Sequence, residues 1–569
     1  MSFTEEKIVE TKICEKSQIS FNITDKDLEF YDKISPTFGG KKYSIPAPTL
    51  APESRQQRRL SCRNETRLYS RKCDATDKSI ISIYSPDKSY KVFASSYWWS
   101  DEWDATDYGL DYDLSLSFFE NFKKLDLHVP KLATTIQNSE NCEFTNDTGD
   151  SKDCYMSYRT HYSDNILHSY RANRSSNCTD CYQVKESEDL YECFQCNKCS
   201  RSQYLYKCEN THSSYFLYQC VGSANCFLSY NQINANYVFL NQTLSKEQYQ
   251  QKLDEVLSDP LKFEQAKQHF FSMIKNDISV PALDNSQSQQ CIGNELIECQ
   301  ECKHCYMMKQ SEFCKYCWDN VGYKNSMDTY SGGGSEYCYE TLATKNSFKN
   351  CFTHRVRESN NLLYCMFSFF SNDCFGCTGI RNKQYCILNK QYSKEEYEEL
   401  VPKIIEKMQQ DGEWGEFFPA SMSPFGYNET VAQEYFPLTK EEAIEQGFNW
   451  SDYEAPFPKV EKVIPASKLP HNITDIPDDI LNWAIECEIT KKPFRIIPQE
   501  LKFYRKHNLP IPRRHPDQRH LDRMSLRNPR KLFERVCDHP DCDTTMQTTY
   551  APDRSESVYC QTCYDKEVY

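Results

Sequence analysis

The chain repeats itself at two levels, and this nested repetition limits the folds that it can adopt. At one constant offset, Cys14, Phe21, Phe30 and Tyr31 return as Cys487, Phe494, Phe503 and Tyr504. At a second offset, Arg55, Arg63, Leu68, Arg71 and Cys73 return as Arg519, Arg527, Leu532, Arg535 and Cys537. A segment near each end of the chain is therefore a copy of one module.

The region between the two modules is also duplicated. Cys226, Phe227, Tyr237, Leu240, Ser245 and Tyr249 recur as Cys374, Phe375, Tyr385, Leu388, Ser393 and Tyr397. The 569 residues are enough for several domains of ordinary size. We predict a first module over 1–125, repeat blocks with capping helices over 140–258 and 291–410, a connector over 412–480 and a last module over 481–569.

Each repeat block consists of short aromatic and cysteine runs, roughly 11 residues apart, separated by polar turns. Strands this short without helices between them indicate an all-β unit, so we predict a β-solenoid with about two strands per coil. A meandering antiparallel sheet is the alternative. A capping box at Ser245 to Gln248, and again at Ser393 to Glu396, predicts a helix after each block. The second helix would place Tyr397, Val401 and Ile405 on one face that covers the block.

Charge and composition restrict the class of protein. The net charge of -15 argues against a chain that coats nucleic acid by bulk electrostatics. There is no apolar run of about 18 residues and no apolar signal core at the start, so we expect a cytoplasmic protein with no membrane segment. In a reducing compartment the 30 cysteines are better explained by metal binding or by burial than by disulfides.

The strongest chemical motif lies near the C-terminus, where Cys537-x4-Cys542 is followed by Cys560-x2-Cys563. Two cysteine pairs on turns can place four thiolates at the corners of a tetrahedron, which is the geometry of a structural zinc site. Because no position is left for water, such a site stabilises a fold and does not catalyse a reaction. We therefore predict Zn as the cofactor, held by these four cysteines.

The first module keeps only the first of these cysteines, as Cys73. Ala94 and Tyr97 stand where the last module has Cys560 and Cys563, so the first module is predicted not to bind zinc in this way. We expect the aromatic cluster of Tyr97 and the two following tryptophans to replace the metal with an apolar core.

Other cysteines allow two interpretations. Cys487 could join His515 and His520 in a second metal site, but the first module keeps Cys14 without either histidine, which favours core packing. Within the blocks, C-x2-C pairs such as those at Cys193, Cys299, Cys314 and Cys374 either bind metal or form ladders inside a solenoid.

The segment from Arg513 to Arg535 is rich in arginine and is the best nucleic-acid candidate, beside the predicted zinc site. Its copy in the first module predicts a helix from Arg55 to about Tyr69. The alternative is that these arginines pair with the carboxylates of the chain.

Phosphate loops, nucleophile elbows and HExxH motifs are absent from the sequence, and glycine is scarce at 16 residues. Nothing in the sequence therefore supports an enzyme or identifies a small-molecule substrate.

The last module and two short segments of the first module resemble a known protein family. The segments that carry the resemblance are IIPQELKFYRKHNLPIPRRHPDQRHLDRMSLRNPRKLFERVCD and TTYAPDRSESVYCQTCY in the last module, and YSPD and WWSDEWD in the first. This family comprises uncharacterised cysteine-rich, zinc-ribbon-like or treble-clef-like proteins of candidate-phyla bacteria. Some of them carry the label CaiB/BaiF CoA-transferase, which no residue of this chain supports. The resemblance implies zinc binding without an established activity.

These observations together predict an α+β multidomain protein, with two β-solenoid-like blocks flanked by two homologous zinc-ribbon or treble-clef-like modules. We expect a zinc-binding scaffold that interacts with a protein partner. A nucleic-acid-binding protein that acts through residues 513–535 is the alternative.

Overall fold

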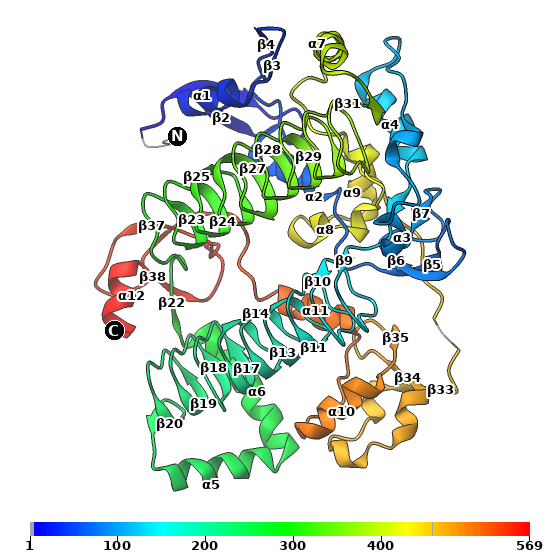
Figure 1. Ribbon diagram of the computed structural model, residues 1–569. Coiled ribbons are helices and arrows are strands. Elements are labelled where there is room, and N and C mark those ends of the chain that lie inside the picture. The colour runs from blue at the N-terminus through cyan, green and yellow to red at the C-terminus, as the bar shows by residue number, and fades with distance from the viewer. Residues whose placement is uncertain (1–4, 458, 569) are drawn as a thin grey trace.

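The computed structural model describes residues 5–457 and 459–568. The chain is a mixed α and β protein with many separate sheets. Two long stacks of short strands lie side by side and run in opposite directions, with the other segments packed around them (Figure 1). No helix in these described ranges is both long and apolar enough to cross a bilayer.

The first coil stack, residues 136–239, is wound from coils in which each strand pairs in parallel with the strand one coil later. Hydrogen bonds along the stack join residues 12 apart, so a coil is slightly longer than the sequence spacing suggested. The parallel pairing rules out the antiparallel meander. Its larger strands are β11 (Asp164–Leu167), β12 (Tyr170–Asn173), β13 (Ser176–Thr179), β14 (Tyr182–Lys185), β15 (Glu188–Tyr191), β16 (Phe194–Asn197), β17 (Ser200–Tyr206), β18 (Tyr215–Tyr218), β19 (Ala224–Tyr230) and β20 (Asn236–Phe239).

The second coil stack, residues 286–387, is built in the same way, again with parallel pairing. Its strands are β23 (Ile292–Ile297), β24 (Lys303–Lys309), β25 (Glu312–Lys315), β26 (Trp318–Val321), β27 (Lys324–Gly333), β28 (Tyr339–Lys345), β29 (Cys351–Arg357), β30 (Met366–Phe369) and β31 (Cys386–Ile387).

Small side chains at every third residue allow such narrow coils. In the first stack these inward residues include a serine ladder, in which the Ser163 backbone N–H donates to Ser151 Oγ at 3.2 Å, and Ser175 N–H donates to Ser163 Oγ at 3.2 Å. Cysteine, alanine, valine and leucine fill the remaining inward positions. The serine hydroxyls of this ladder are hydrogen-bonded and so avoid the desolvation penalty that unpaired groups impose, whereas the buried Thr160 hydroxyl has no hydrogen-bond partner among the described residues.

The chain turns at every third residue by adopting a left-handed backbone conformation. Asn138, Asn141, Phe144 and Asp147 open this series, with φ values of 46°, 50°, 50° and 55°. A residue other than glycine costs roughly 1–2 kcal/mol in this conformation. The continuous ladder of backbone hydrogen bonds between coils offsets that cost.

Each terminal module packs on the coil stack that is farther away in sequence. The first module contains β1 (Ile8–Ile13), β2 (Ser20–Thr24), α1 (Asp25–Ile34) and α2 (Pro52–Leu60), and it shares one apolar core with the second stack. The last module contains β34 (Trp483–Glu486), β35 (Pro493–Phe494), α10 (Pro498–Lys506) and α11 (Pro516–Met524), and it shares another core with the first stack. The domain boundaries drawn from the sequence remain predictions.

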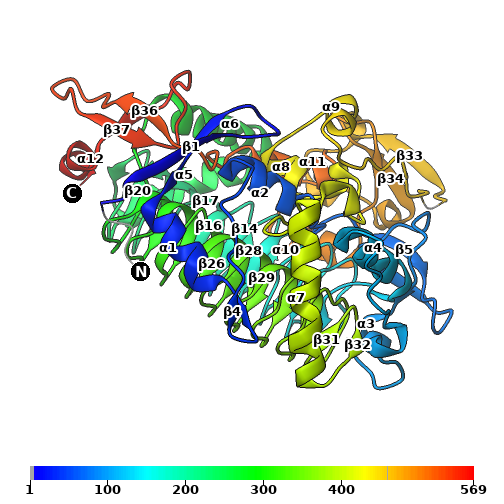
Figure 2. The same cartoon turned by 90° about the horizontal axis from the view of Figure 1, so that it is seen from above.

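The helix expected from Arg55 to about Tyr69 is shorter than predicted. It is α2, which ends at Leu60, and a strand, β5 (Tyr69–Lys72), follows. The predicted capping boxes are confirmed at the helices after each stack, α5 (Lys246–Leu257) and α7 (Lys394–Asp411). Helix α7 buries Tyr397, Val401, Ile404, Ile405 and Met408 and lies beside β31 at the end of the second stack (Figure 2).

The two stacks meet through equivalent positions. Arg171 of the first stack pairs with Asp319 of the second, at 3.1 Å from Nη1 to Oδ1, and these two residues correspond to each other in the repeat. On either side, Gln195 contacts Glu295 and Arg355 contacts Asp147. The molecule therefore has an internal two-fold relation, with an arginine and an aspartate facing each other at its centre.

Candidate metal centre

The four cysteines of the C-terminal motif lie on a hairpin and on the helix that follows it. Strands β36 (Phe533–Val536) and β37 (Thr545–Thr548) pair antiparallel, and the turn between them carries Cys537 and Cys542. Strand β38 (Ser557–Tyr559) then leads to Cys560, directly before α12 (Gln561–Val568), which carries Cys563 near its start.

The sulfur atoms of Cys537, Cys542, Cys560 and Cys563 all lie within 4.8 Å of one another. Cys542 Sγ and Cys560 Sγ are 3.9 Å apart. Cys537 and Cys563 are buried, whereas Cys542 and Cys560 are half-buried at the edge of the module. Four clustered thiols can together hold one metal ion, and this donor set matches the ions that prefer sulfur.

Hydrogen bonds prepare the cluster for a metal. The Cys560 backbone N–H donates to Cys537 Sγ at 3.2 Å. A hydrogen bond with Thr544 Oγ1, 3.3 Å from the sulfur, lowers the pKa of Cys542 to about 6. Metal ligands of this kind must be deprotonated, which suits Cys542. Burial raises the pKa of Cys537 and raises that of Cys563 to about 12, so a metal bound there would displace their protons.

The first module has the same local scaffold without the ligands. The Ala94 backbone N–H donates to Cys73 Sγ at 3.3 Å, just as Cys560 N–H does to Cys537 Sγ. Around this contact, Asp74 and Val92 exchange two hydrogen bonds, of 3.0 and 2.7 Å. Asp538 and Val558 exchange the same two bonds in the last module, at 3.0 and 2.8 Å.

Aromatic side chains surround this metal-free scaffold. Trp98 is buried, with its ring centroid 5.4 Å from that of Trp103 and 5.7 Å from that of Phe369 in the second stack. The aromatic core that we expected next to Ala94 is therefore present, although it is built with partners from outside the module.

The structure does not unite Cys487 with the two histidines. Cys487 is fully buried and its sulfur accepts the Thr490 backbone N–H at 3.5 Å. His515 Nδ1 instead accepts the Asp517 backbone N–H at the start of α11, and His520 lies 3.6 Å from Glu434. Among the described residues, the four C-terminal cysteines are the single group of side chains found that could together hold a metal ion.

The cysteines of the repeat blocks point into the coils. The thiol of Cys196 is 3.2 Å from the Leu205 carbonyl oxygen one coil along, and the thiol of Cys317 is 3.4 Å from the Ser326 carbonyl oxygen. These contacts place both thiols inside the coils, so the geometry matches the ladder interpretation of the C-x2-C pairs.

The central arginines of the nucleic-acid candidate segment are buried or half-buried and contact other parts of the protein. Arg519 and Arg523 are 5% and 3% exposed, and both donate to Asp180 of the first stack. Arg530 donates to Asp319 at 2.6 Å, and Arg527 donates to Tyr435 Oη at 2.8 Å. These contacts fit the alternative given for this segment, in which its arginines pair with carboxylates of the chain. The segment is also not one helix, because α11 ends at Met524.

The first module makes the equivalent contacts with the second stack. Arg55 and Arg59 of α2 donate to Asp328 at 2.7 and 3.0 Å. Arg55 corresponds to Arg519 and Asp328 corresponds to Asp180, each by the offset of its own repeat. Both modules therefore dock an arginine helix on the same place of a coil stack. In the sequence, the signal for these two places is a pair of carboxylates one coil apart in each stack, Asp180 with Glu192 and Asp328 with Glu340.

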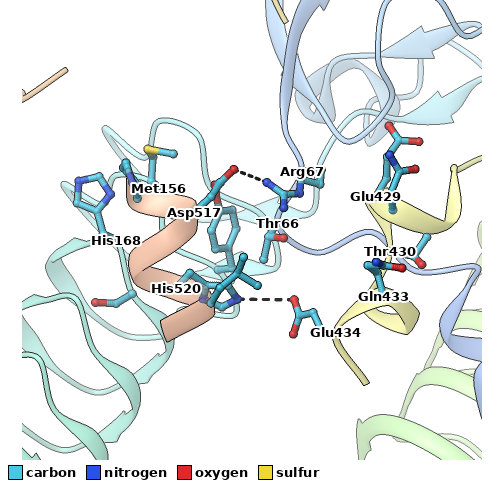
Figure 3. Close-up of a pocket in the computed structure, with 15 residues that line it drawn as sticks. Thr66, Arg67, Met156, His168, Glu429, Thr430, Gln433, Glu434, Asp517 and His520 are labelled. Carbon is cyan, nitrogen blue, oxygen red and sulfur yellow. Dashed lines mark hydrogen bonds and ion pairs between the residues drawn. The ribbon is translucent and has the colours of Figure 1, made fainter. Parts of the chain in front are cut away.

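A small cavity of about 80 Å³ lies at the junction of four parts of the chain. Arg67, His168, Glu434, Asp517 and His520 line it, with ion pairs between Arg67 and Asp517 and between His520 and Glu434 (Figure 3). These side chains already pair with one another and join modules, so we assign no ligand to the cavity.

No protein-family model matches the chain, and no curated protein matches it. Among solved structures, the chain is similar to the crystal structure of a putative acetyltransferase from Desulfovibrio desulfuricans G20. The identity is 10%, over 50% of this chain and 79% of that chain, with a TM-score of 0.10. A likeness this remote carries no argument about function.

Proposed function

We propose that the protein is a zinc-stabilised scaffold whose two coil stacks are β-solenoids that present an interaction surface to a protein partner. The cluster of four cysteine sulfurs within 4.8 Å carries this proposal. Zinc is preferred to iron because a closed set of four thiolates on two turns is the usual structural zinc site. The metal would contribute folding free energy and leave no coordination position for chemistry.

The position of the cysteine module explains what zinc would stabilise. Strand β38, next to Cys560, pairs in parallel with β22 (Ser279–Pro281) in the segment that leads into the second stack. From the other side, Tyr564 Oη on α12 donates to Gln219 of the first stack at 2.8 Å. A metal at the four cysteines would therefore hold together the last module, the linker and the first stack.

The first module occupies the equivalent position without a metal. Its β7 (Val92–Phe93) pairs in parallel with β8 (Lys131–Leu132), which leads into the first stack. Two homologous strand pairs, β38 with β22 and β7 with β8, thus lie at the starts of the two stacks. We propose that the first pair depends on zinc and the second on aromatic packing.

Metal analysis tests the zinc assignment. Reduced, folded protein should contain one zinc per chain, and Cys560→Ser should lower that content and release β38 from β22, as measured by hydrogen exchange. The control is Cys73→Ser, which removes the first-module equivalent of Cys537 and should leave zinc content unchanged. Folded protein without zinc would reject the assignment.

Nucleic-acid binding is the alternative function, and the burial of Arg519 and Arg523 and the contacts of half-buried Arg527 and Arg530 with Glu434 and Asp319 argue against it. Electrostatic binding is strongest at low salt, so a gel-shift series starting at about 50 mM salt is the most favourable test. A retarded band that disappears steeply as salt rises would restore this alternative. We expect no band.

A further inference from the structure

Strand β1 of the first module has an open edge, and the last module shows what such an edge can hold. In the last module, β34 is the central strand of three, with β35 on one side and β33 (Lys462–Pro465) on the other. In the first module, β1 pairs with β2 alone among the described residues. Strand β1 lies on the surface of the molecule, above the second stack (Figure 2).

The two strands are equivalent residue by residue. The turn after each is closed by the same bonds, because Cys14 N–H donates to Ile19 O at 2.9 Å and Cys487 N–H donates to Lys492 O at 3.0 Å. The strand pairing also corresponds, since Lys12 lies opposite Phe21 as Ile485 lies opposite Phe494. The edge of β1 that faces away from β2 is therefore the edge that β33 occupies in the last module.

Strand β1 also has the exposed apolar side chains expected of a strand without its neighbour. Ile8, Val9 and Ile13 are 63%, 57% and 65% exposed. In the last module, where β33 is present, Ala484 and Ile485 are fully buried, whereas their equivalents in β1 are the exposed Thr11 and the half-buried Lys12. An exposed apolar edge strand is a template for pairing with another chain.

We propose that the open edge of β1 binds an extended segment of a partner protein, which adds to the sheet as a parallel strand. The register of β33 against β34 indicates which type of residue the partner segment should carry at each position. Lys462 lies opposite Trp483, with its ammonium group 4.2 Å from the ring centroid, and the equivalent of Trp483 in β1 is Glu10. The partner segment therefore has a basic residue opposite Glu10.

The following positions of the partner segment are apolar. Ile464 of β33 is 9% exposed and lies opposite Ile485, whose equivalent is Lys12. The Lys12 ammonium group donates to Ala47 O at 3.2 Å, which leaves its aliphatic stem along the strand. A branched aliphatic residue two positions after the basic one would pack on this stem, followed by an apolar residue opposite Ile13.

This inference rests on the proposed interaction role but not on zinc. The probe is a fluorescein-labelled peptide of residues 460–468, VEKVIPASK, which carries the register of β33. Because the edge of β34 is already filled, the peptide should bind the full-length zinc-loaded protein at one site, measured by fluorescence anisotropy. Glu10→Lys should weaken binding at least about tenfold, and a peptide with Lys462→Glu should bind this variant better than the original peptide does.

The control variant is Ile489→Lys, which adds a lysine at an exposed isoleucine of the equivalent turn in the last module and should leave binding unchanged. Absence of saturable binding up to about 1 mM peptide would overturn the proposal. Equal affinity of the peptide for the wild type and for Glu10→Lys would also overturn it. A dimer that is detected by sedimentation and dissociated by Glu10→Lys would assign the β1 edge to a second copy of the chain instead. Zinc content measured on the same samples separates this failure from failure of the zinc assignment.

Discussion

Replacement of Asp180 by alanine tests whether the arginine helix of the last module is held by a buried ion pair. The Asp180 side chain is 0% exposed and accepts hydrogen bonds from both Arg519 and Arg523, whose side chains are 5% and 4% exposed. Asp180→Ala would leave two guanidinium groups buried, with Glu500 and Glu192 as their remaining carboxylate neighbours at 3.4 and 3.5 Å.

The expected cost follows from the desolvation of these cations. Removing one partner of a buried pair typically destabilises by about 3–5 kcal/mol, because the remaining charge stays out of water. The more distant Glu500 and Glu192 reduce this loss, so we expect a value near the lower end, about 3 kcal/mol. At about 1.4 kcal/mol per tenfold change, this corresponds to a roughly 100-fold larger population of the undocked helix.

Hydrogen exchange of the α11 amides measures this population directly, since undocking exposes them to solvent. Asp180→Ala should speed their exchange by roughly 100-fold while amides inside the coil stacks keep their protection. The control is Asp189→Ala, nine residues further along the first stack, where the partner Lys506 is 55% exposed and the loss should stay below about 1 kcal/mol. Equal exchange rates in the two variants would refute the reasoning.

Three further predictions concern zinc, acid and thiol reactivity. Removing metal with a chelator should unfold the last module and spare the first. Hydrogen exchange should therefore rise around Cys560 and stay unchanged around its equivalent, Ala94; uniform loss of structure would contradict this. Burial by itself raises the pKa of Glu500, but His168, 3.1 Å away, acts together with Arg519 and the Tyr504 hydroxyl to outweigh it and lower the pKa to about 2. The associated stability is present above the ordinary value of 4.5 and is lost as pH falls from there towards 2, by roughly 3 kcal/mol, and Glu500→Gln should flatten this dependence in acid titrations followed by circular dichroism. Burial raises the pKa of Cys226 to about 11, whereas a hydrogen bond with Cys154 lowers the pKa of half-buried Cys142 to about 7. Iodoacetamide should therefore modify Cys142 before Cys226, as measured by mass spectrometry.

The internal repeats made much of the architecture predictable. Residues that return at constant offsets, such as Cys14 and Cys487, must occupy equivalent places in equivalent folds, so two modules and two blocks followed from the sequence. Capping boxes act locally, through bonds between residues three apart, and Ser245 and Ser393 begin their helices as predicted. The clustering of the C-terminal cysteines is local in the same sense, because one hairpin and one helix start supply all four.

The period of three in the blocks was present in the sequence but was masked by their aromatic residues. Serine, threonine and cysteine recur at many positions three residues apart because small side chains fill most of the inward positions of a coil this narrow. The aromatic residues that set the apparent spacing, such as Tyr182 and Phe194, lie outside the coil and stack on each other instead, with ring centroids 4.8 Å apart.

Only the tertiary structure decided what the arginines do. A run of arginines has the same appearance whether it faces phosphates or buried carboxylates, and the carboxylates that pair with Arg519 and Arg55 lie hundreds of residues away in sequence, at Asp180 and Asp328. Sequence repetition showed that the modules were alike, but not that each crosses over to the distant coil stack. Which stack a module packs on depends on which surfaces bury complementary charge and apolar area together. Those surfaces come together only when the two stacks lie side by side in opposite directions.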